Sequence, residues 1–173
     1  MKTHIAEWLV SMLHGKQLLF VTLTCPRRVE RDELSHAIGR LIHRVKRRVL
    51  GRKAERAEIA QVIVLEPTYM GGAHAHLILE DPYSLPTAKP FPCAVPIGRL
   101  ITKEWANLGI GGNAVAQDVQ RVYDLPGVIQ YLQKTLGGTH VLDRLDINNF
   151  CLPNRSALSP IPNSHVPPVR DNK

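Results

Sequence analysis

"EIAQVIVLEPTYMGGAHAHLILE", residues 58 to 80, predicts the β-hairpin around which the fold is built. Residues 58–66 and 74–80 are rich in aliphatic and β-branched side chains, and the proline and paired glycines between them are typical of a turn. Successive side chains of a strand point to opposite faces. One face of the second strand is therefore purely apolar, whereas the other begins with His74 and His76.

The polar face of this hairpin predicts a small cluster of metal-binding side chains. If the turn places residue 66 opposite residue 74, Glu66 projects beside His74, with Cβ atoms about 5 Å apart. Two imidazole nitrogens and one carboxylate oxygen can hold a divalent ion and leave positions open for substrate oxygens. We therefore expect a metal site at Glu66, His74 and His76. The alternative is that they are ordinary polar side chains near a surface.

The segments around the hairpin predict an α+β fold. The expected order is strand, helix, strand, strand, helix, strand, helix, after a short N-terminal helix closed by Gly15. This order favours an antiparallel sheet of four to five strands with flanking helices. The remaining predicted strands cover residues 18–25 and 113–123, and the helices cover residues 1–15, part of 31–56, 97–109 and 125–138.

The length of 173 residues favours one domain, which we place at residues 1–150, followed by a Pro-rich C-terminal tail at 151–173. No continuous apolar segment approaches membrane-spanning length, and the N-terminal segment lacks the pattern of a signal peptide. We expect a cytoplasmic protein without a membrane partner. The three scattered cysteines favour reduced thiols over a disulfide framework.

The charge of the chain favours a polyanionic partner. Lys and Arg number 22 against 15 Asp and Glu, which gives a formal net charge of +7. Arg40, Arg44 and Arg47 recur beside the apolar stripe of the helix within residues 31–56. Beside a phosphate-handling site, this basic face would hold a nucleic-acid backbone. The alternative is an ordinary solvated helix face.

The last predicted helix contains "YLQK", in which Tyr131 and Lys134 are three residues apart and share one face. A phenol has an ordinary pKa of about 10, so its attack on a phosphodiester requires a metal ion and nearby positive charge. Lys134 would supply that charge. The alternative is the common amphipathic pattern of a half-buried tyrosine beside a lysine whose stem lies along apolar surface.

Three segments in this order, "TLTCP", "HAH" with the upstream Glu66, and "YLQK", resemble the three motifs of the HUH endonuclease superfamily, of the rolling-circle replication initiator (Rep) type. The resemblance covers roughly residues 18 to 136. It implies a sheet of ferredoxin-like or RRM-like topology. It also implies that Glu66, His74 and His76 bind Mg²⁺ or Mn²⁺.

The resemblance further implies a reaction and a partner. Tyr131, with Lys134 as its electrostatic partner, would attack single-stranded DNA or a DNA hairpin at a nick site. The products would be a 5′-phosphotyrosine and a free 3′-hydroxyl, which initiates replication of a plasmid or phage-like element. Cys25 departs from the viral members, which often carry an aromatic residue in the first motif. The DNA contacts implied near that motif are Thr22, Thr24, Arg27 and Arg28.

Other functions fit parts of the same pattern. Single-tyrosine HUH transposases share the motif order, whereas conjugative relaxases resemble a circular permutation of it. A non-catalytic module for single-stranded nucleic acid is a second alternative, although such modules depend on aromatic platforms and only 5% of this chain is aromatic. A metal-dependent hydrolase that uses water is a third. "GIGGNA" lacks the lysine of a P-loop, so replication would require a separate helicase from the host.

Overall fold

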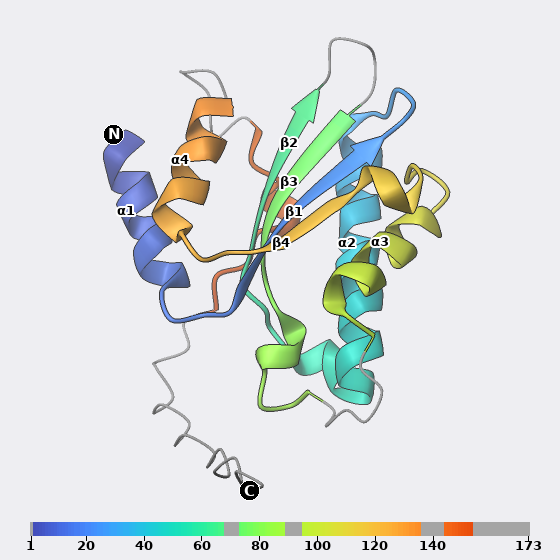
Figure 1. Cartoon of the computed structure of the whole chain (residues 1–173), viewed down its shortest axis with the longest axis horizontal. Helices are drawn as coiled ribbons and strands as arrows, with labels where there is room; N and C mark the ends of the chain where they lie inside the picture. The colour runs from blue at the N-terminus through green and yellow to red at the C-terminus, as the bar shows by residue number, and fades with distance from the viewer. Residues whose placement is uncertain (1, 68–72, 89–94, 136–143, 154–173) are drawn as a thin grey trace, which may run out of the picture.

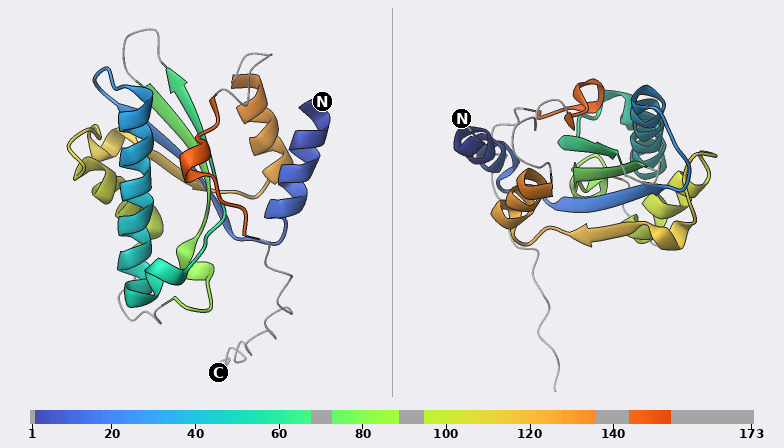
Figure 2. Two further views of the ribbon diagram at one scale, coloured as in Figure 1. Left: turned by 180° about the vertical axis from the view of Figure 1, so that it is seen from behind. Right: turned by 90° about the horizontal axis from the view of Figure 1, so that it is seen from above.

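The computed structural model describes residues 2–67, 73–88, 95–135 and 144–153, and it has helices on both faces of one four-stranded sheet (Figures 1 and 2). The strands are β1 (Leu18–Cys25), β2 (Gln61–Pro67), β3 (Ala73–Glu80) and β4 (Asp118–Arg121). The helices are α1 (Lys2–Leu13), α2 (Arg31–Leu50), α3 (Ile97–Ala106) and α4 (Leu125–Thr135). The predicted α+β class is confirmed.

The strands lie in the order β2-β3-β1-β4, and every neighbouring pair is antiparallel. Sequence neighbours β2 and β3 form the predicted hairpin, while β3 lies between β1 and β2 as in a split β-α-β arrangement. The two central strands are therefore β1 and β3. The "TLTCP" and "HAH" segments are consequently side by side at the end of the sheet where β1 finishes and β3 starts.

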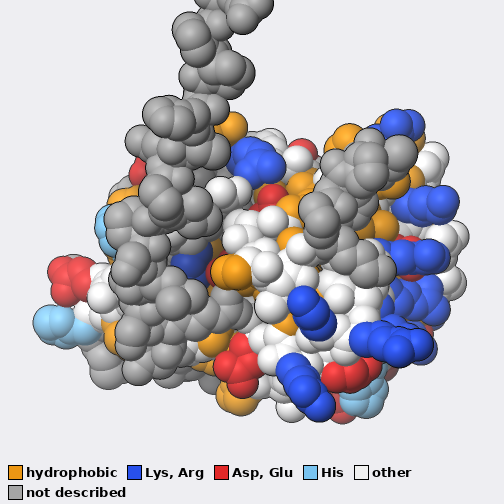
Figure 3. Space-filling view, turned by 90° about the horizontal axis from the view of Figure 1, so that it is seen from below, with side chains coloured by type: hydrophobic (Ala, Val, Ile, Leu, Met, Phe, Trp, Pro, Cys, Tyr) orange, Lys and Arg blue, Asp and Glu red, His pale blue; other side chains and the backbone are white. Residues whose placement is uncertain are grey.

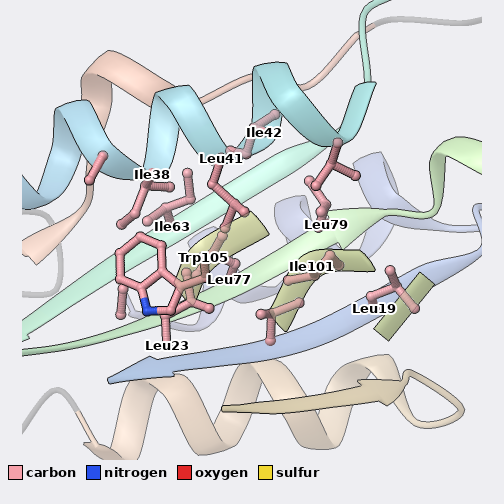
Figure 4. Close-up of a cluster of buried hydrophobic side chains, with 14 of the residues drawn as sticks. Leu19, Leu23, Ile38, Leu41, Ile42, Ile63, Leu77, Leu79, Ile101 and Trp105 are labelled. Atoms are coloured by element: carbon pink, nitrogen blue, oxygen red, sulfur yellow. The ribbon is translucent and has the colours of Figure 1, made fainter. Parts of the chain in front are cut away.

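The purely apolar face of the hairpin packs against α2 and α3. Leu77 of β3 lies among Leu41 of α2 and Ile101 and Trp105 of α3, all of them almost completely buried (Figure 4). The apolar stripe predicted for the basic helix packs here, since Leu34, Ile38, Leu41, Val45 and Val49 are all buried. The long helix therefore occupies the face of the sheet opposite the histidines.

The histidine face is covered in part by α1 and α4 (Figure 2). Their apolar side chains pack with Val62 of β2 and Ile78 of β3 in a second, smaller core. Along β3 the next side chains on this face, towards the hairpin turn, are His76 and His74. The polar cluster thus begins where the second core ends, which places it between buried apolar side chains and solvent.

Residues 144–153 run along β2 (Figure 2). The backbone of Cys151 exchanges two hydrogen bonds with Gln61, of 2.8 and 3.0 Å, and the buried carboxylate of Asp146 accepts a hydrogen bond from Ser35 of α2 at 2.9 Å. The segment pairs with a strand that would otherwise be an open sheet edge. The predicted boundary after residue 150 falls inside it, and residues 154–173 of the predicted tail lie outside the described part of the chain.

The strand predicted over residues 113–123 is shorter in the structure, where β4 is only Asp118–Arg121. Residues 114–116 form a 3-10 turn instead, because the side chain of Asn113 accepts a hydrogen bond from the Val115 amide at 3.2 Å. Asparagine commonly forms such local bonds in preference to a ladder. The prediction was therefore too long at both ends, by residues 113–117 and 122–123.

Candidate metal and tyrosine site

The hairpin register brings the three predicted metal ligands onto one patch. Glu66 of β2 lies directly opposite His74 of β3, as the turn residues predicted. The carboxylate of Glu66 reaches along the strand to His76, with 3.3 Å between its Oε2 atom and the Nε2 atom of the imidazole. Two strands therefore hold two imidazoles and one carboxylate on the same face.

The neighbouring strand β1 holds the other side of each imidazole. Thr22 lies opposite His76 and Thr24 lies opposite His74. The Thr22 hydroxyl is 3.2 Å from Nδ1 of His76, and the Thr24 hydroxyl is 3.1 Å from Nδ1 of His74. Both imidazole rings therefore contact the "TLTCP" segment of β1 through Nδ1. The resemblance implied DNA contacts for these threonines, but their hydroxyls are engaged within the protein.

Tyr131 on α4 joins this patch from a distant part of the sequence. Its ring stands edge-on to His76, with centroids 6.0 Å apart and planes at 89°. Phe20 of β1 fills the angle between them, stacked on His76 at 5.7 Å and edge-on to Tyr131 at 5.9 Å. Tyr131 is 50% exposed, so a substrate has access to the tyrosine while the aromatic contacts fix its ring.

His76 is buried, and this burial lowers the pKa of its imidazole against the opposing effect of the Glu66 carboxylate. The ring is therefore neutral at neutral pH. A neutral imidazole keeps a lone pair, which is the form that binds a metal ion. Burial and the stacked Phe20 thus keep His76 rigid and in the protonation state of a ligand.

The donor set is compatible in its chemistry with a small divalent ion, since imidazole nitrogens suit Zn²⁺, Fe²⁺ and related ions and carboxylate oxygens suit Mg²⁺ and Mn²⁺. The 3.3 Å separation of Glu66 and His76 is that of a hydrogen bond or ion pair between the two side chains. Within the described ranges, however, no group of three or more His, Cys, Asp or Glu side chains has the arrangement of a complete metal site.

The remaining predicted residues of the two motifs lie apart from this patch or outside the description. Lys134 belongs to α4, but its side chain lies outside the part of the chain that the structure describes. Cys25 points into the core on the α2 side and is 2% exposed. Burial also raises the pKa of its thiol. Cys25 is therefore neither a stacking partner for DNA bases nor a thiolate nucleophile.

The predicted basic contacts are not gathered around the histidines. Arg40, Arg44 and Arg47 lie on α2, across the sheet from the patch, on the side where Lys and Arg side chains gather (Figure 3). Arg44 is 3.8 Å from the buried carboxylate of Glu104. The other cations are placed as follows: Arg47 lies 3.8 Å from Glu55, Arg27 pairs with Glu33 at 2.6 Å, and Arg28 is exposed after β1.

This placement gives the basic helix a separate test. If Arg40, Arg44 and Arg47 neutralise single-strand phosphates, their replacement by Gln should reduce the slope of log K against log salt by about 0.7 for each arginine. Replacement of Arg52, Lys53 and Arg56 by Gln removes equal charge from the adjoining 3-10 helix and serves as the control. Fluorescence anisotropy measures both slopes. An unchanged slope for the α2 variant would leave these arginines as a solvated face.

Sequence reasoning missed Phe20, the side chain that links the imidazole to the phenol. Phe20 shares a face with Thr22 and Thr24, since all three are at even positions of β1. That alternation could be read from the sequence, whereas the face that Phe20 shares with the histidines follows from the pairing of β1 with β3. The packing of Phe20 against Tyr131 could not be predicted from the sequence, because this contact depends on where α4 lies on the sheet.

Comparison of the chain with protein-family models, with curated proteins and with solved structures finds no match. None of the helices that the structure describes is long and apolar enough to cross a membrane. The described cysteines Cys25 and Cys151 are free thiols. The function is therefore argued from the geometry of the patch formed by Glu66, His74, His76 and Tyr131.

Proposed function

We propose that the chain is a metal-dependent endonuclease that nicks and rejoins single-stranded DNA through Tyr131, as its resemblance to Rep proteins implies. The observation that carries the proposal is the approach of the Tyr131 ring to within 6.0 Å of His76. A phenol, two imidazoles and a carboxylate from three elements of the fold share one partly open patch. Few structural needs bring these groups together at a surface, whereas phosphoryl transfer uses all of them.

Some of the proposed residues would bind the metal ion, and others would act in the attack on the phosphodiester. Glu66, His74 and His76 would hold a Mg²⁺ or Mn²⁺ ion, which when bound supplies polarisation of a phosphate oxygen. Phe20 packs edge-on against the Tyr131 ring beside the imidazole, and the half-exposed phenol would be open to a substrate. Lys134 remains the predicted source of positive charge near the attacking oxygen.

The proposed reaction conserves the phosphodiester. The phenolic oxygen of Tyr131 forms a bond to phosphorus, and the bond from phosphorus to the 3′ oxygen breaks. The phenolic proton passes to solvent, and the released 3′ oxygen takes up a proton as a free hydroxyl. The DNA 5′ phosphate stays on the tyrosine, so the 3′ hydroxyl can reverse the reaction without ATP. Such an end can also be extended by a polymerase, which suits replication of a plasmid or phage-like element.

Covalent capture of DNA tests the proposal. The protein should be incubated with pooled single-stranded oligonucleotides and Mn²⁺, then separated on a denaturing gel. We expect a shifted protein band that disappears with a chelator. Cleavage without a shifted band would indicate a hydrolase that uses water, and binding without cleavage would indicate a non-catalytic module. A single-tyrosine transposase would also give the band, but it would recognise the ends of a mobile element instead of a replication origin.

The binding-module alternative is weaker on this structure than the enzyme. Such modules present aromatic rings as open platforms for bases. Phe20 on the histidine face already packs against His76 and Tyr131, so its ring is occupied within the protein. Tyr131 is the half-exposed ring at this patch. A single phenol beside two imidazoles favours chemistry over stacking.

A further inference from the structure

The hydroxyls of Thr22 and Thr24 approach the same nitrogen, Nδ1, of the two imidazoles at 3.2 and 3.1 Å. We infer that these threonines are positioning residues: each hydrogen-bonds Nδ1 of its histidine, His76 or His74, and so directs Nε2 of that imidazole towards the metal site. The inference rests on the proposed metal site and deepens it. The DNA contacts that the resemblance implied for the two threonines stay a separate prediction.

The hydrogen bonds around His76 fix its tautomer before metal enters. Its Nε2 atom is 3.3 Å from the Glu66 carboxylate, which can only accept a hydrogen bond when ionised. The neutral ring must therefore carry its proton on Nε2. Its Nδ1 atom is then an acceptor, and the Thr22 hydroxyl donates to it. In this state the nitrogen that faces Glu66 has no lone pair for a metal.

If Nε2 of His76 held a metal ion, these roles would reverse. The ring proton would then sit on Nδ1, which would become a donor, and the Thr22 hydroxyl would accept. The number of protons on His76 stays the same, because one leaves Nε2 and one arrives at Nδ1 through exchange with water. A hydroxyl serves both states because it can donate or accept, whereas a carboxylate only accepts and an ammonium only donates. The Thr22 hydroxyl can therefore hydrogen-bond Nδ1 of His76 with and without the ion.

His74 differs because its threonine has a second acceptor within reach. The Thr24 hydroxyl lies 3.5 Å from the Ala116 carbonyl, and when it donates there its lone pairs accept from Nδ1 of His74 at 3.1 Å. His74 then carries its proton on Nδ1 and has a free lone pair on Nε2. The side chain of Gln117 holds Thr24 in place, since Gln117 Oε1 accepts from the Thr24 amide at 2.6 Å. In that arrangement the tautomer of His74 already suits a metal ion, whereas His76 must change its tautomer.

Heteronuclear NMR of protein labelled with ¹⁵N-histidine reads the two tautomers directly. In metal-free protein we expect the proton of His76 on Nε2 and that of His74 on Nδ1. Saturating Mg²⁺ should move the His76 proton to Nδ1 and leave His74 unchanged. If His76 carries its proton on Nδ1 before metal is added, or if both rings share one tautomer without metal, the inference is overturned.

Substitutions at Thr22 separate positioning from packing. Thr22→Val removes the hydroxyl and keeps a β-branched side chain suited to a strand, so the fold should hold. We expect its Mn²⁺ affinity, measured by electron paramagnetic resonance, to fall about 10- to 100-fold, the usual loss for a partner of a ligating histidine. Thr22→Ser restores the hydroxyl and should restore the affinity. The control is Thr102→Val in α3, whose hydroxyl donates to the Arg99 carbonyl.

The outcomes distinguish this inference from the proposed function. Wild-type Mn²⁺ affinity in Thr22→Val overturns the positioning role but leaves the metal site and the tyrosine chemistry standing. Loss of DNA binding in Thr22→Val with unchanged Mn²⁺ affinity also overturns it and restores the direct role in DNA binding. Failure of the wild-type protein to bind Mn²⁺ would instead overturn the metal site itself, and the switch would fall with it.

Discussion

Tyr131→Phe should abolish the covalent protein–DNA adduct, by at least about a thousandfold, because it removes the attacking oxygen of the proposed reaction. The substitution keeps the ring that packs edge-on against His76 and Phe20. DNA binding and thermal stability should therefore remain close to those of the wild type. The adduct is measured on a denaturing gel and by mass spectrometry, and DNA binding by anisotropy on the same oligonucleotide.

Two other tyrosines provide matched controls for this variant. Tyr123 is 92% exposed after β4, and the Tyr83 hydroxyl donates to the Val95 carbonyl at 3.2 Å. Tyr123→Phe and Tyr83→Phe should form the adduct as the wild type does. Nucleotide on either of them, or on Tyr69, would mean that Tyr131 is not the nucleophile. Cleavage that survives Tyr131→Phe without any adduct would point to attack by water.

The β-hairpin could be predicted closely from sequence because its information is local. Alternation of side chains fixed the faces of β3, and the turn placed Glu66 opposite His74 as expected. The approach of Tyr131 to His76 could not be obtained this way, because 55 residues separate them and their proximity depends on how α4 packs on the sheet. The resemblance to Rep motifs supplied that expectation.

The placement of the basic helix exposes a step that sequence reasoning left out. A helix with a long apolar stripe must bury it, and the longest wholly apolar surface in the hairpin is the face of Leu77 and Leu79. That argument puts α2 opposite the histidines, where the structure has it. Arg40 and its neighbours were instead considered beside the histidine site. Any nucleic acid that they bind must lie on a different side of the molecule from Tyr131.

Substitution of His74 and His76 together should also abolish the proposed activity. His74→Ala combined with His76→Leu removes both nitrogen ligands and should weaken Mn²⁺ binding more than a hundredfold, since loss of a mere partner of such a ligand costs about 10- to 100-fold. Metal-dependent cutting should disappear with it. Leucine is used at position 76 because that side chain is buried against Phe20, where an alanine would leave a cavity, and because leucine has no atom that binds a metal ion.

The core on the opposite face gives reason to expect that this double variant stays folded. Leu77 and Leu79 pack against α2 and α3 and are untouched by either substitution. Circular dichroism should show an unchanged secondary structure, with thermal stability lowered by the lost contacts of the histidines with Phe20, Thr22, Thr24 and Glu66. His36→Ala with His43→Ala, two exposed histidines of α2, is the matched control and should bind Mn²⁺ and cut as the wild type does. Undiminished cutting by a folded His74→Ala, His76→Leu protein would exclude this patch as the metal site, because Glu66 alone cannot hold a divalent ion against water.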